Sequence, residues 1–103
     1  MPIANDLDPC KRFADVAGYD LGMSSSESLR RAADLLAAGD WEGAHAIVQD
    51  DPSSLAAWMH GIVHLLEGDV TNARYWYGCA RRAFPGEAAV RDEIEAVRAT
   101  VEP

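Results

Sequence analysis

The chain has 103 residues, 49% of them hydrophobic and 25% charged, which suits one globular domain with one hydrophobic core. The net charge is −8, and the span between Arg31 and Arg74 holds several acidic residues but no lysine or arginine. Phosphate backbones bind through lysine and arginine, so we expect no nucleic-acid binding.

The sequence shows no targeting signal and no cysteine motif. No apolar run approaches the roughly 20 residues that cross a bilayer, and the N-terminus has two acids before its first base, unlike a signal peptide. Cys10 and Cys79 have no C-x-x-C partner, so they predict neither a disulfide framework nor a thiolate metal site, although their distance in space stays open. We therefore expect a cytoplasmic protein with no membrane segment and no cofactor.

The first element expected is an N-terminal arm over residues 1–25, in which Asp8-Pro9 could begin a short helix and the segment through Ser26 is loop. An all-α domain then covers residues 26–103. In its first helix, apolar residues recur at i, i+3, i+4 and i+7, which indicates one buried face; these are Leu29, Ala32, Ala33 and Leu36. Gly39 ends this helix and Asp40 caps the second, which stops at Asp50-Asp51-Pro52.

Three further helices follow in the same style. Ser53 or Ser54 begins the third, which Gly68 ends; Asp69 caps the fourth, whose inner face runs as far as Phe84 before Pro85-Gly86 breaks the chain. The fifth shows an apolar face and charges elsewhere, which is typical of a terminal cap over an open core; that face holds Val90, Ile94, Val97 and Val101. The tryptophans Trp41, Trp58 and Trp76 fit helical core spacing.

Two segments repeat with a spacing of 29 residues, around a shared Gly-Asp-x-x-x-Ala: Gly39 pairs with Gly68, and Ala44 with Ala73. With these residues, the chain resembles the tetratricopeptide repeat (TPR) over about residues 27–85. The second copy carries the TPR positions Gly61, Gly68, Asp69, Ala73, Tyr77, Ala80 and Pro85, and the first keeps Gly39, Asp40, Trp41 and Ala44. Trp58 falls one place off the usual aromatic position and His60 replaces the usual Leu. The resemblance implies antiparallel helix hairpins, with a C-terminal capping helix, that act as an interaction module.

A narrower resemblance covers residues 58–77, WMHGIVHLLEGDVTNARYWY. This string is similar to a hallmark, EGD-x-x-NA-x-YWY, of a family of small bacterial and fungal proteins. It implies the same fold and brings no activity with it.

The third helix carries the best candidate site. His60, His64 and Glu67 follow i, i+4, i+7 and share a face nearly opposite the apolar stripe, which in a TPR hairpin is the concave groove. Two histidines and a carboxylate are a sensible start for a divalent metal site, but the set is incomplete and has no H-E-x-x-H base. The alternative is that these side chains hydrogen-bond a neighbouring helix or face solvent. His45, beside Ala44 on the second helix, is expected to be half-buried.

The fourth helix presents Asn72, Tyr75 and Cys79 away from its buried face, and an outward tyrosine is a common interface residue. No nucleophile motif, phosphate loop or dinucleotide fingerprint is present, so we identify no catalytic residue and favour a non-enzyme. The leading hypothesis is a protein-interaction or scaffolding module whose acidic surface accepts a basic or amphipathic partner. The alternative is a small-molecule or divalent-metal-binding protein, or an enzyme, that uses His60, His64 and Glu67.

Two repeats bury little core by themselves. The arm, the fifth helix or a second copy of the chain must therefore cover the remainder, which leaves a homodimer open.

Overall fold

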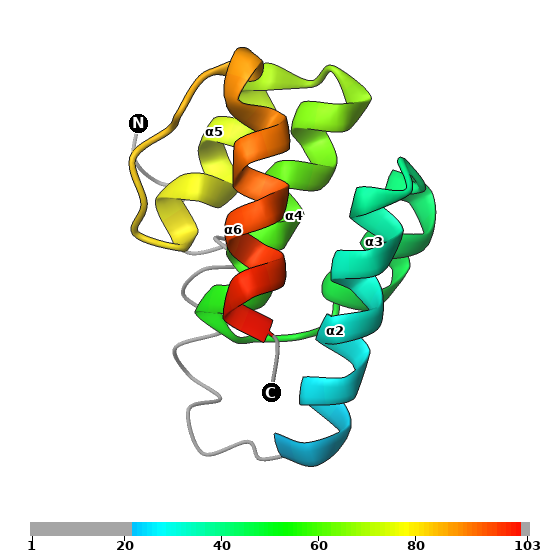
Figure 1. Ribbon diagram of the computed structural model, residues 1–103. Helices are drawn as coiled ribbons and strands as arrows, with labels where there is room; N and C mark the ends of the chain where they lie inside the picture. The colour runs from blue at the N-terminus through cyan, green and yellow to red at the C-terminus, as the bar shows by residue number, and fades with distance from the viewer. Residues whose placement is uncertain (1–21, 102–103) are drawn as a thin grey trace.

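The computed structural model describes residues 22–101, and the side chains of residues 27–101. Five α-helices and one 3-10 helix make up this part of the chain (Figure 1), so the all-α prediction is confirmed. The α-helices are α2 (Gly22–Ala37), α3 (Trp41–Val48), α4 (Ser54–Glu67), α5 (Val70–Cys79) and α6 (Val90–Val101); the 3-10 helix η2 spans Glu87–Ala89. The proposed short helix at Asp8-Pro9 lies outside the described residues.

The helices form two hairpins, α2–α3 and α4–α5. Their turns have the same conformation and lie 29 residues apart in the sequence. Gly39 and Gly68 both have a left-handed φ, +85° and +91°, which glycine adopts at little cost. Asp40 then accepts a hydrogen bond from the Gly43 amide and Asp69 from the Asn72 amide, at 3.0 and 3.2 Å, so each aspartate caps the next helix. The predicted spacing and capping are confirmed, while the tetratricopeptide assignment stays a prediction.

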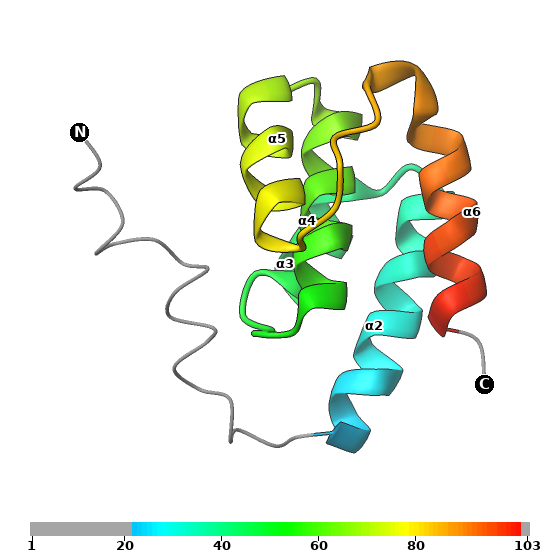
Figure 2. The same cartoon turned by 90° about the vertical axis from the view of Figure 1, so that its left-hand side faces the viewer.

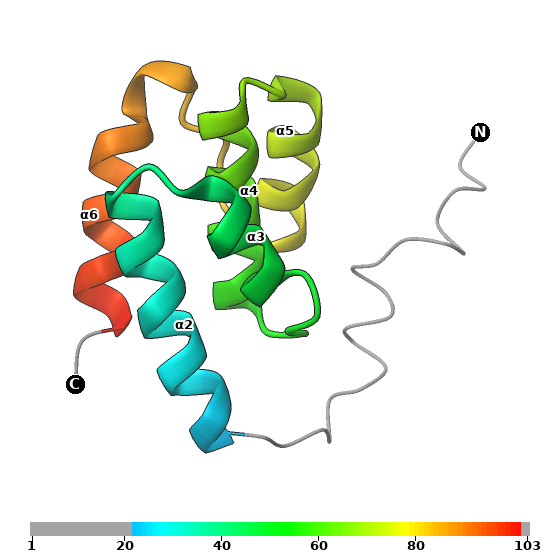
Figure 3. The ribbon, with the colours of Figure 1, turned by 90° about the vertical axis from the view of Figure 1, so that its right-hand side faces the viewer.

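The central helix of the molecule is α4. Figures 2 and 3 show α5 on one side of it, and α2 with α6 on the other. The core lies between α4 and its neighbours, and its largest fully buried side chains are Tyr77, Leu36, Met59, Ile62, Val48, Val63 and Val97. Among the tryptophans, Trp58 and Trp76 are buried and Trp41 is half-buried.

The last helix, α6, packs against α2 and also contacts α4. Its buried residues Ile94 and Val97 face this core, and Arg98 lies 3.6 Å from Asp34 of α2. The expected terminal cap is therefore present. It lies along the first helix of each hairpin, which is the side where the resemblance places a concave binding groove.

Two expected boundaries were wrong. α2 begins at Gly22, so the serine run lies within the helix and the expected boundary at residue 25 falls four residues late; serine has only a moderate preference against helix. α5 ends at Cys79, because Arg81 adopts a left-handed φ of 61°. Phe84 still packs against the core, from the loop after the helix.

The spacing of the cysteines left their distance in space open. Cys79 is disulfide-bonded, and Cys10 lies outside the described residues. Between residues 22 and 101, no helix is long and apolar enough to cross a membrane.

Candidate metal centre

All three histidines of the chain meet on one side of α4. His60 and His64 lie one turn apart on α4, and His45 reaches them from α3. Each offers a ring nitrogen, and the three nitrogens lie within 4.8 Å of one another. Ring centroids are 4.7 Å apart for His45 and His60, and 5.0 Å apart for His60 and His64. The structure therefore brings together a possible three-nitrogen donor set from two hairpins.

His60 is the innermost member of this histidine cluster, with 5% of its surface exposed. Its ring stacks flat on the Trp76 indole of α5, with centroids 3.9 Å apart and planes inclined by 6°. Because ring nitrogens point outward in the plane of the imidazole, this stacking covers a face of His60 and leaves its nitrogens available. Within the described residues no hydrogen bond engages the ring nitrogens of His45 or His60.

Burial, followed by the charges that His45 and His64 would carry, lowers the pKa of His60 from 6.5 to about 3. A cationic ring would lose its hydration there, and it would also repel the neighbouring imidazolium groups. His60 is therefore neutral at physiological pH, which is the form that binds metals.

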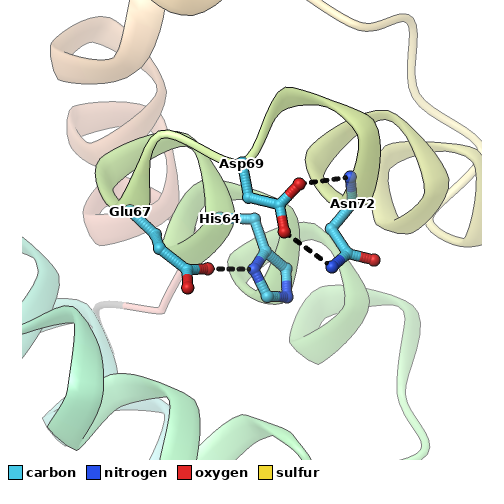
Figure 4. A network of polar contacts seen from close by, with 4 residues as sticks. All are labelled: His64, Glu67, Asp69 and Asn72. Carbon is cyan, nitrogen blue, oxygen red and sulfur yellow. Dashed lines mark hydrogen bonds and ion pairs between the residues drawn. The ribbon is translucent and has the colours of Figure 1, made fainter.

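His64 is oriented by a carboxylate. Its Nδ1 lies 2.7 Å from Glu67 Oε1, as Figure 4 shows, so Nε2 is the nitrogen left for another partner. Histidines that bind metals commonly present the second ring nitrogen to such a carboxylate, which fixes the ring and raises its basicity. The side chains of His64 and Glu67 are 12% and 36% exposed, so this edge of the cluster reaches solvent.

Asp69 and Asn72 extend the network beyond His64 (Figure 4). Asp69 accepts two hydrogen bonds from Asn72, one at each carboxylate oxygen. The backbone N–H of Asn72 donates at 3.2 Å and its side-chain Nδ2 at 2.9 Å. The side-chain bond, then the backbone bond, holds the pKa of Asp69 below its ordinary value. Ligand atoms of His64, Glu67 and Asp69 also lie within 4.8 Å of one another, although Asp69 is already engaged as the cap of α5.

The predicted site residues thus divide into two groups. His60, His64 and Glu67 lie together as expected, and Asn72 joins them through Asp69. Tyr75 is 38% exposed on α5 and contacts Trp76 edge-on, outside the histidine cluster. The site also lies against α3 and α5, whereas the resemblance placed it in the groove that α6 occupies.

Sequence reasoning missed the part that His45 plays. It placed this residue correctly as half-buried on the second helix, but it did not connect α3 with the outer face of α4. The usable signal was that consecutive helices pack together, so that a histidine on one can meet an i, i+4 pair on the next.

Comparison with protein-family models, curated proteins and solved structures gave no significant match. The chemistry of the site therefore rests on its own geometry.

The burial of His60 should make the stability of the protein depend on pH. Because the pKa of His60 is about 3 when folded and near 6.5 when unfolded, unfolding takes up a proton between these values, and the free energy of unfolding should fall as pH drops below 6.5. Urea titrations in chelator between pH 6.5 and about 5, where most carboxylates stay ionised, should show a steeper fall for the wild type than for His60→Asn. The two proteins should differ by at most one in the number of protons taken up on unfolding, which sets the slope of the unfolding free energy against pH. Equal slopes would contradict the lowered pKa of His60.

Proposed function

We propose that this protein binds one divalent transition-metal ion, through the ring nitrogens of His45, His60 and His64. The observation that carries this proposal is the convergence of three imidazole nitrogens within 4.8 Å. Neutral imidazole suits zinc, copper and nickel, and three-histidine sets occur at zinc centres. The His64–Glu67 pair supplies the outer carboxylate that such sites commonly have.

The geometry requires a small closure on binding. In a tetrahedral site with metal–nitrogen bonds of about 2.0 Å, ligand nitrogens lie about 3.3 Å apart, compared with up to 4.8 Å here. His60 is held by Trp76, whereas His45 and His64 lie nearer to the surface. We expect rotation of the His45 and His64 side chains toward His60 to close the site, with Glu67 following the His64 ring.

Isothermal titration of metal-free protein with Zn²⁺ should give one site per chain. His45→Ala should weaken zinc affinity by more than about 100-fold, because it removes a ligand, and Glu67→Gln by about 10- to 100-fold, because it removes the carboxylate that orients His64. His45 is a sharp test since its ring is half-buried and outside the apolar core.

Matched controls separate the site from the acidic surface. Gln49→Ala alters an exposed residue just after the same helix as His45, and Glu95→Gln removes one exposed negative charge from α6. Both should bind zinc as the wild type does. Absence of a zinc site, or equal affinity in all four variants, would contradict the proposal.

We propose a protein-interaction role as a second candidate, favoured by Tyr75. It is an exposed large apolar side chain in the described part of the chain, and the net charge of −8 favours a basic or amphipathic partner. Cross-linking from residue 75 in the native lysate should capture a partner, or a second copy of this chain. A cross-linker placed at another residue of the Tyr75→Ala variant should no longer capture that species. If it still does, Tyr75 is not part of the interface.

A further inference from the structure

We infer that the metal bound by the histidine cluster keeps one exchangeable coordination position, open to solvent, which takes a small monodentate anion. This inference rests on the proposed metal binding and adds the class of ligand that the site accepts.

The histidine cluster supplies three donor atoms. Three imidazole nitrogens fill three positions of a tetrahedral metal, and centres with three protein ligands keep the fourth for water or substrate. In residues 22–101, no fourth histidine, cysteine or carboxylate shares the group formed by His45, His60 and His64. The nearby acids Glu67 and Asp69 meet only His64 in this way.

These two acids already have partners. Glu67 is held at 2.7 Å by His64 Nδ1, on the side of the ring away from Nε2, and Figure 4 shows this contact. Asp69 receives two hydrogen bonds from Asn72 and caps α5. If either carboxylate moved to the metal, it would lose these contacts, so a solvent ligand is the simpler occupant.

One side of the histidine cluster is open to solvent. His60 and Trp76 close the inner side of the cluster, with 5% and 8% of their surfaces exposed. The outer side is formed by half-buried His45, by His64 and by the more exposed Glu67. A small ligand can therefore approach the cluster from this side.

Charge defines the ligand class. Three neutral imidazoles leave the full double charge of the metal, which favours an anion or hydroxide at the remaining position. The net charge of −8 opposes large polyanions. Small monovalent anions, such as azide, formate or bicarbonate, are therefore the expected ligands.

Cobalt(II) substitution tests this inference on the full-length chain. The cobalt protein should show visible d–d bands, and titration with sodium azide should shift these bands along a saturating curve. Sodium perchlorate at equal ionic strength should leave the bands unchanged, because perchlorate coordinates metals poorly. Glu95→Gln, which removes an exposed charge from α6, should keep the azide-dependent shift, because Glu95 lies outside the histidine cluster.

The outcomes separate the two proposals. Absence of cobalt binding would overturn the proposed function itself. If cobalt binds but azide does not change its spectrum, only the open coordination position would be overturned. A side chain would then complete the coordination. Loss of the azide shift in Glu95→Gln would also overturn the assignment, because the shift would then depend on surface charge and not on the histidine cluster.

Discussion

Gly61→Ala is expected to destabilise the protein by about 2 kcal/mol, within the range for overpacked cores. A Cβ atom at this position would lie 2.5 and 2.7 Å from two ring carbons of Tyr77. Tyr77 is fully buried, and its hydroxyl donates a hydrogen bond to Glu93 at 2.8 Å, so its ring cannot simply turn away. Gly61 is therefore the contact that lets α4 and α5 approach closely.

Gly78→Ala is the matched control for Gly61→Ala. Gly78 lies in α5, and a Cβ atom there meets no described residue within 4 Å beyond its chain neighbours and the backbone of its own helix. Without a steric cost, alanine should stabilise the helix by about 0.5 to 1 kcal/mol, through its better helix propensity. Urea denaturation of the two variants should give shifts of opposite sign, and a stabilised Gly61→Ala variant would contradict the close approach.

Removal of the Glu93 carboxylate should have the second large effect. Its Oε1 accepts hydrogen bonds from Trp58 Nε1 at 2.9 Å and from the Tyr77 hydroxyl at 2.8 Å, so one oxygen of α6 joins α4 and α5. Glu93→Leu would leave two buried donors unpaired, at a cost of about 2 to 4 kcal/mol. Glu93→Gln keeps an oxygen acceptor and should lose less.

Glu95→Leu provides the comparison for Glu93→Leu on the same helix. Glu95 is exposed, and a surface substitution of this kind usually changes stability by less than about 0.5 kcal/mol. Unfolding of the three variants can be followed by tryptophan fluorescence, because Trp58 reports on this junction. Equal stability of Glu93→Leu and Glu95→Leu would show that the two hydrogen bonds contribute nothing measurable.

Local rules allowed much of the fold to be predicted. Glycine followed by aspartate marks both hairpin corners, because glycine adopts the left-handed conformation and aspartate caps the next helix. The end of α5 could not be predicted this way. Ala80, Arg81 and Arg82 favour helix by propensity. Arg81 nevertheless adopts a left-handed φ, and Arg82 places its guanidinium 3.6 Å from the centroid of the Trp58 ring, a contact with α4 that local propensity does not contain.

The candidate site shows the same division between local and distant information. His60, His64 and Glu67 follow from helical spacing on one element, and the structure brings them together. His45 depends on how α3 packs on α4, and Trp76 on how α5 does. Helical periodicity gives the direction of a side chain from its own axis, but not which neighbouring helix it meets.

The position of α6 along α2 and α4 has a consequence for recognition. An amphipathic helix from another protein that bound the same surface would compete with α6, which residues 80–89 tether to α5. Tethering gives an effective concentration on the order of millimolar, so an untethered rival must bind far more tightly to displace α6. The α6 helix of a second copy of the chain carries the same apolar face and could replace α6. Exchange of this helix between two chains would turn the intramolecular contact into an intermolecular one.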